Sequence, residues 1–170
     1  MNKRPDASTG HAKHAHRSAE EQSQCEAMLR ELFEKQIQFN DILGLSVASL
    51  KPDGPQLAFF MRQDLVGNFV HYRLHGGVIS AALDTVGGLA VAVALAEKHP
   101  GDSAEEVAHR FNRVGTIDLR VDYLRPGQGK RFVATGRVIR LGGRIASLQM
   151  TLENDAGELI ATGAGSYVVS

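Results

Sequence analysis

The chain contains one long segment, residues 78–96, that is apolar on every side. All nineteen of its residues are aliphatic except Ser80, Asp84, Thr85, Gly87 and Gly88. Such a segment is either a membrane span or a helix enclosed by its own protein. A carboxylate such as Asp84 would cost about 2.5 to 3.5 kcal/mol near the middle of a bilayer. The strands predicted downstream also need an apolar partner, so we predict a buried helix and no membrane.

Four later segments alternate apolar and polar residues with the period of two that is typical of strands. They span residues 115–125, 130–140, 144–154 and 158–169. Upstream, residues 43–50 and 56–62 flank a turn rich in proline and glycine and predict a hairpin. The pattern therefore predicts an α+β domain, in which a curved antiparallel sheet that includes a four-strand meander wraps the apolar helix.

The N-terminal region has a different character. Residues 1–17 are polar and have few bulky side chains, which predicts a disordered tail. Ser18 and Glu21 form a capping-box pattern, after which apolar residues recur at helical spacing and predict an amphipathic helix over 19–39. We thus divide the chain into a tail (1–17), an N-terminal helical segment (18–41) and a main domain (42–170).

Composition narrows the classes of function. The 170 residues include 19 Lys and Arg against 19 Asp and Glu, and this balance argues against a broad surface for nucleic acid. Cys25 is the one cysteine and cannot form an intrachain disulfide, and residues 1–17 lack the apolar core of a signal peptide. We expect a cytoplasmic protein with no nucleic-acid partner.

Candidate chemistry gathers where the apolar helix begins. Gly76 and Gly77 precede it, and the first N–H groups of a helix have no acceptor within the helix. Such a site suits a carbonyl oxygen that becomes negative during acyl transfer. A carboxylate such as Asp84 is costly to bury on so apolar a helix unless it is hydrogen-bonded. It is either a general base or nucleophile, or an acceptor of hydrogen bonds from a neighbouring loop.

The spacing of these residues has a consequence for assembly. Gly76 and Asp84 are eight residues apart, which is about 12 Å along a helix. One thioester carbonyl cannot contact both within one chain. If both act on one substrate, the active unit is at least a homodimer, and a tetramer formed as a dimer of dimers is also compatible.

A set of motifs resembles a known family. Asn68, His75-Gly76-Gly77, Asp84 nine residues after the histidine, and the strand opening at Thr116 are similar to the hotdog-fold acyl-CoA thioesterases of the phenylacetyl-CoA thioesterase (PaaI-like) group. The similarity covers roughly residues 42–169. It implies that the Gly76 N–H polarises the thioester carbonyl and that Asp84 of the facing subunit activates water or attacks directly. Asn68 and His75 would position the thioester or brace the loop, and Thr116 would hold the water or the carboxylate.

Coenzyme A would enter as part of an acyl-CoA substrate, with no metal or redox cofactor. Candidate contacts to it are Gly77, Arg125, Arg140 and Arg144, although most basic residues of this region are equally compatible with a solvated sheet face.

Two other functions stay open from the sequence. A hydratase or dehydratase acting on an acyl thioester could use His75 and Asp84 as acid and base, and a noncatalytic protein could bind acyl-CoA. Neither the acyl-chain length nor an aromatic preference can be read from the sequence.

Overall fold

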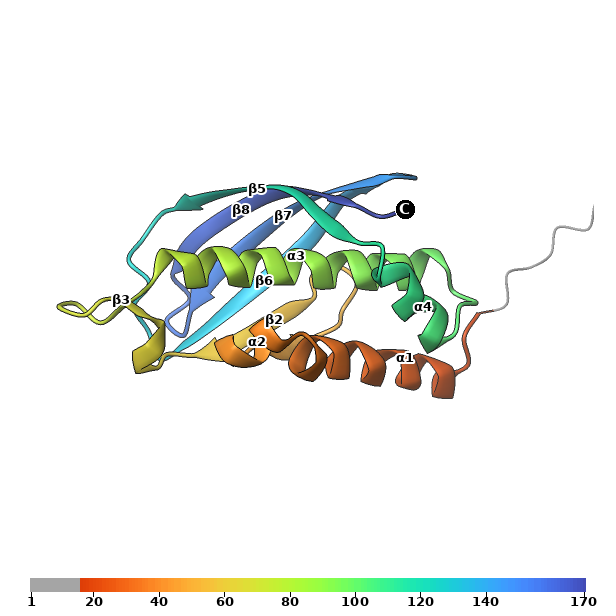
Figure 1. Ribbon diagram of the computed structural model, residues 1–170, viewed down its shortest axis with the longest axis horizontal. Coiled ribbons are helices and arrows are strands. Elements are labelled where there is room, and N and C mark those ends of the chain that lie inside the picture. The colour runs from red at the N-terminus through yellow and green to blue at the C-terminus, as the bar shows by residue number, and fades with distance from the viewer. Residues whose placement is uncertain (1–15) are drawn as a thin grey trace, which may run out of the picture.

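The computed structural model describes residues 16–170, and Figure 1 shows a curved antiparallel sheet lying across one long helix. The helices are α1 (Ala19–Glu31), α2 (Gln38–Leu43), α3 (Gly76–Lys98) and α4 (Ala104–Phe111), with a π-helical turn at Leu32–Gln36 and a 3-10 turn at Gln63–Leu65. The strands are β1 (Ser46–Ser49), β2 (Gln56–Phe60), β3 (Val66–Asn68), β4 (Arg73–Leu74), β5 (Gly115–Tyr123), β6 (Arg131–Leu141), β7 (Ile145–Asn154) and β8 (Leu159–Val168).

Six strands form the main sheet in the order β1-β2-β6-β7-β8-β5, and every neighbouring pair is antiparallel. The predicted strand positions for β5 to β8 agree with the structure to within about two residues. The predicted meander of four strands, β5 to β8, is wrong, because among these four only β6, β7 and β8 follow one another in the sheet. β5 instead pairs with β8 at the edge, with Gly115 opposite Val168. Alternation identifies a strand but does not specify its partner.

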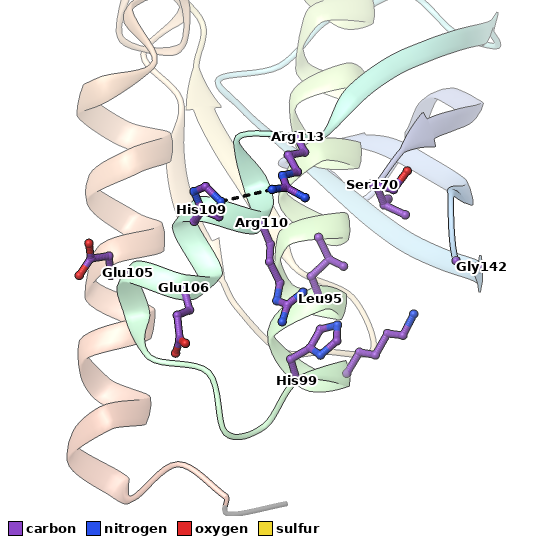
Figure 2. A pocket seen from close by; sticks show the side chains of 12 residues that line it. Leu95, His99, Glu105, Glu106, His109, Arg110, Arg113, Gly142 and Ser170 are labelled. Carbon is purple, nitrogen blue, oxygen red and sulfur yellow. Dashed lines mark hydrogen bonds between the residues drawn. The ribbon is translucent and has the colours of Figure 1, made fainter.

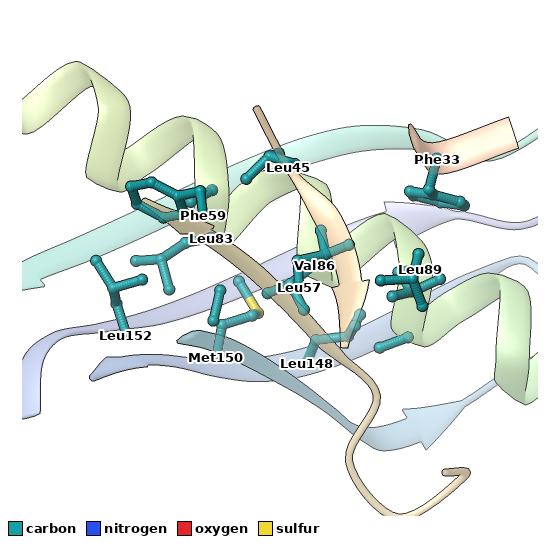
Figure 3. Packing of buried hydrophobic residues seen from close by; sticks show 14 of the residues in the cluster. Phe33, Leu45, Leu57, Phe59, Leu83, Val86, Leu89, Leu148, Met150 and Leu152 are labelled. Atoms are coloured by element: carbon teal, nitrogen blue, oxygen red, sulfur yellow. The ribbon is translucent and has the colours of Figure 1, made fainter. Parts of the chain in front are cut away.

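Helix α3 fills the concave face of the sheet. In Figure 3, Leu83, Val86 and Leu89 of this helix lie among side chains of β2 and β7, and all three have no exposed surface. Gly136 of β6 permits this close packing, because a Cβ there would lie 2.6 Å from the Val86 carbonyl oxygen. By length and composition α3 could span a membrane, but 61% of its most apolar window is buried inside the protein.

The N-terminal segment begins as the sequence predicts. The Ser18 hydroxyl accepts from the Glu21 N–H, and the Glu21 carboxylate accepts from the Ser18 N–H, which confirms the capping box. The predicted continuous helix over 19–39 is wrong, because the chain is extended at Ile37. The Ile37 N–H bonds to the Leu32 carbonyl in a π-turn, and the buried Asn40 side chain donates to the Phe33 carbonyl at 3.0 Å. The side chain thus satisfies a carbonyl at the break in the helix.

The predicted tail over 1–17 lies mainly outside the described residues. Arg17 is described, and its side chain bonds to the end of α3. Its guanidinium donates to the carbonyls of Ala96, His99 and Asp102 at 2.7 to 3.1 Å, at the C-terminal end of α3. The last carbonyls of a helix have no N–H donor within the helix, so a cation that donates to them satisfies them. These bonds join Arg17 to the end of α3, and the bounds of the predicted tail stay a prediction.

Candidate active site

One free N–H group marks the start of α3. His75 is the N-cap, and its Nδ1 accepts from the Gly77 N–H at 2.9 Å. The His75 carbonyl accepts from Val78 at 3.0 Å. Between these bonds, the Gly76 N–H has no acceptor among the described residues. Because the helix dipole adds partial positive charge there, this N–H is suited to hold an oxyanion.

The same capping bond defines the state of His75. A backbone N–H always donates, so Nδ1 must be unprotonated, and a neutral ring carries its proton on Nε2. With Nδ1 engaged as an acceptor, His75 can donate a hydrogen bond from Nε2. The bond also engages the Gly77 N–H, which the sequence analysis assigned to coenzyme A, so this group is already satisfied within the chain.

Asn68 ends β3 and braces the loop before the helix. Its Oδ1 accepts from the His71 N–H at 3.1 Å, and the Gln128 side chain donates to the His71 carbonyl at 3.0 Å. This contact lies within the loop, and the roles that the resemblance implies for Asn68 stay predictions. The short hairpin of β3 and β4 leads from the 3-10 turn to the start of α3.

A pocket of about 340 Å³ surrounds Gly76. Its lining includes Asn68, Arg73, Tyr123 and Arg125. The Tyr123 hydroxyl donates to the Gly76 carbonyl at 3.1 Å, and Arg125 donates to the Leu159 carbonyl at 2.9 Å. The Nε of Arg73 is buried and has no hydrogen-bond partner within the described chain. No role is predicted from the sequence for Arg73 or Tyr123, because their contacts depend on tertiary packing.

Asp84 is held from two strands. The Thr116 hydroxyl, at the start of β5, donates to Asp84 Oδ1 at 2.8 Å. The Tyr167 hydroxyl, from β8, lies 2.9 Å from both the carbonyl and Oδ1 of Asp84. Gly87 makes room for it, because a Cβ at that position would overlap the Tyr167 hydroxyl.

The Tyr167 hydroxyl is suited to donate to Asp84. Burial, and secondly the charge of Asp84, raise the pKa of Tyr167 far above its ordinary value. The hydroxyl therefore keeps its proton throughout the neutral range and directs it at Asp84. Sequence reasoning missed this residue, because a tyrosine in an alternating strand indicates only that its ring is buried.

A second pocket, of about 170 Å³, contains Asp84. Its walls come from the N-terminal segment, α4 and the start of β5, and include Phe33, Ile37, Phe111 and Val114. None of its lining residues also lines the Gly76 pocket. Both Gly76 and Asp84 belong to α3, so the predicted separation of about 12 Å along the axis holds. One chain therefore presents two half-sites and does not bring them together.

The predicted arginine contacts fall at opposite ends of the sheet. Arg125 lies in the Gly76 pocket, whereas Arg140 and Arg144 flank the β6–β7 turn at the far end. The β6–β7 turn borders the largest pocket described, about 700 Å³, which Figure 2 shows between α4 and the C-terminal end of α3. Arg140 and Arg144 therefore cannot join Arg125 at one ligand within a chain. Because consecutive antiparallel strands turn at alternate edges of a sheet, the connection before β6 and the turn after it lie at opposite edges.

Comparison with known proteins identifies the family. Residues 71–161 match the model of the thioesterase superfamily. The chain belongs to this superfamily. It is 39% identical over 142 residues to an Escherichia coli protein named medium/long-chain acyl-CoA thioesterase YigI, a match that spans 84% of this chain and 92% of the relative. A Salmonella typhimurium protein of the same name is 40% identical over the same shares.

Solved structures agree with this membership. A Shewanella oneidensis protein described as related to the thioesterase superfamily is 38% identical, with a TM-score of 0.83, over 91% of this chain and all of that one. The protein therefore has the predicted hotdog fold, with an added N-terminal helical segment.

Proposed function

We propose that this protein is an acyl-CoA thioesterase that hydrolyses medium- or long-chain acyl-CoA to a free acid and coenzyme A. The two relatives named for that activity support the substrate class. The observation that carries the reaction is the pair of half-sites: a helix N–H with no acceptor at Gly76, and a carboxylate held by two hydroxyls at Asp84. The finer likeness to the phenylacetyl-CoA thioesterase group stays a prediction.

In the proposed reaction, Asp84 accepts a proton from water as the oxygen attacks the thioester carbon. The carbonyl oxygen becomes negative and is held by the Gly76 N–H of the other subunit. When this intermediate collapses, the carbon–sulfur bond breaks, and the departing sulfur takes the proton that Asp84 received. The carboxylate is then ready for another cycle.

A homodimer assembled along β5 would complete the site. β5 begins at one half-site, where Thr116 contacts Asp84, and ends at the other, where Tyr123 contacts the Gly76 carbonyl. It is an edge strand of the main sheet and exposes Ile117 and Tyr123. If two copies of β5 pair antiparallel about a two-fold axis, the start of each strand meets the end of the other, and two composite sites form.

The cationic half-site suits coenzyme A. Arg73 and Arg125 line the Gly76 pocket, and neither forms an ion pair among the described residues. The buried, unpartnered Nε of Arg73 needs an acceptor, which a phosphate or amide oxygen of the coenzyme would supply.

The proposal is tested by measuring thiol release from short, medium, long and aromatic acyl-CoA. Asp84→Ala is expected to abolish turnover in a folded oligomer, and full hydrolysis by that variant would refute the assignment. Gly76→Pro removes the critical N–H at a helix position where proline is well tolerated, after an extended residue. It is expected to lower kcat about 100-fold or more. Gly76→Ala keeps the N–H and is the matched control.

The open alternatives receive less support from the geometry. In a hydratase His75 would have to exchange protons, but its Nδ1 is engaged by Gly77. Loss of the conjugated double bond of enoyl-CoA would favour that function. Tight acyl-CoA binding without thiol release would favour a noncatalytic role.

A further inference from the structure

We propose that the acyl chain of the substrate lies in the pocket beside Asp84, and that Gly88 determines how long a chain this pocket accepts. The inference rests on the proposed thioesterase function and adds to it a position that sets specificity. The N-terminal segment and α4 would then form part of the substrate site.

The charges assign the two ends of the substrate. Asp84 and Tyr167 are the ionisable side chains in the Asp84 pocket, whereas Arg73 and Arg125 lie in the Gly76 pocket. The anionic phosphates of coenzyme A would be repelled by Asp84 and attracted to the arginines. The uncharged acyl chain is therefore the part that fits beyond Asp84.

The walls of the pocket are apolar beyond the carboxylate. Phe33, Ile37, Phe111 and Val114 line it, and the Phe33 and Phe111 rings pack with centroids 5.1 Å apart at 55°. Asn40 also reaches the pocket, but its amide donates to the Phe33 carbonyl and its oxygen accepts from Thr85 at 3.3 Å. This polar group is already satisfied, so it does not favour a polar ligand.

Gly88 lies between Asp84 and the ring pair. It is four residues after Asp84 on α3 and therefore on the same face. A Cβ at Gly88 would lie 3.9 Å from ring atoms of both Phe33 and Phe111, which is ordinary contact with room for one methyl group. The absence of a side chain leaves the inner end of the pocket open, and a larger residue would close it.

The pocket volume sets the scale of the effect. About 170 Å³ is less than the roughly 300–1,000 Å³ of typical ligand sites. Small changes of volume at the inner end should therefore separate chain lengths. One methylene in an apolar pocket alters kcat/KM by about 10- to 200-fold.

The test compares octanoyl-CoA with palmitoyl-CoA in the full-length protein. Gly88→Leu is expected to lower kcat/KM for palmitoyl-CoA about tenfold or more relative to octanoyl-CoA. Phe111→Ala opens the same end from α4 and is expected to shift the ratio toward the longer chain. Gly88→Ala should shift the ratio in the same direction but less than Gly88→Leu, and Gly143→Leu, at a turn glycine with nothing within 4 Å, is the matched control.

The outcomes separate this inference from the function on which it rests. Wild-type protein that releases no thiol from any acyl-CoA contradicts the proposed function. Wild-type turnover with an unchanged chain-length ratio in both Gly88→Leu and Phe111→Ala overturns the acyl pocket alone. A uniform loss for all chain lengths in Gly88→Leu, together with an unshifted ratio in Phe111→Ala, also overturns it.

Discussion

At the scale of single residues, the site depends on which polar groups are already satisfied. His75 engages the Gly77 N–H and thereby leaves the Gly76 N–H as the one available donor at the start of α3. Thr116 and Tyr167 direct two hydroxyls at Asp84 Oδ1. A carboxylate fixed in this way has one defined orientation, and its second oxygen is left for a water molecule.

Tyr167 is therefore expected to act as a positioning residue. Tyr167→Phe keeps the buried ring and removes the hydroxyl that lies 2.9 Å from Asp84 Oδ1. We expect kcat to fall about tenfold while KM changes little, because the hydroxyl contacts the carboxylate and not the substrate. Steady-state kinetics with one acyl-CoA measures both constants. An unchanged kcat, or a rise in KM alone, would contradict this role.

At the scale of elements, the N-terminal segment is tied to the core by more than apolar contact. Arg17 joins it to the end of α3, and Asn40 bridges Phe33 and Thr85. This segment supplies one wall of the Asp84 pocket, so its anchoring also supports the site.

Arg17→Met tests this anchoring. The substitution keeps the apolar stem and removes the guanidinium that donates to three carbonyls. We expect the free energy of unfolding to fall by about 2 kcal/mol, because those carbonyls lose a charged donor. Urea denaturation measures the change. Arg137→Met, at an exposed position of β6, is the control and should differ little from wild type.

The ion pair of Asp102 and Arg110 fixes the α3–α4 connection and predicts a pH dependence. The hydrogen bond from Arg110, aided by its charge, lowers the pKa of Asp102. A lowered folded-state pKa contributes stability above the unfolded pKa of about 3.9, and this stability is lost as the pH falls below it. Asp102→Asn should therefore cost about 1 kcal/mol at pH 7 and progressively less below about pH 4. Urea unfolding across this range checks the trend, and a constant difference would contradict it.

The positions of helices and strands that follow from a local pattern were predictable. Contacts that depend on which elements pack together were not. The β6, β7 and β8 strands alternate because one face packs on α3, so their positions follow from sequence. β5 also alternates, yet Ile117 and Tyr123 are exposed because it is an edge strand. Likewise, the spacing placed Gly76 and Asp84 on one helix, but no sequence pattern revealed Tyr167 or Arg73, which reach the site through tertiary packing.

At the scale of the whole molecule, the two halves of the site occupy separate pockets of one chain, and β5 connects them. A dimer built on this edge is expected to be necessary for activity. Ile117→Glu places a charge at an exposed apolar position near the start of this edge strand and should yield monomers that retain Asp84 and Gly76 but lack turnover. Sedimentation and thiol release measure the two properties. Active monomers would contradict the shared site.

Mixing two inactive variants tests the shared site most directly. Asp84→Ala destroys one half-site and Gly76→Pro destroys the other, so each homodimer should be inactive. In a mixed dimer, the intact Gly76 of one subunit meets the intact Asp84 of its partner at one of the two sites. Random co-assembly makes half of the dimers mixed, so about a quarter of wild-type activity should return. If Gly76 and Asp84 instead act within one chain, every subunit in the mixture carries one defect and no activity returns.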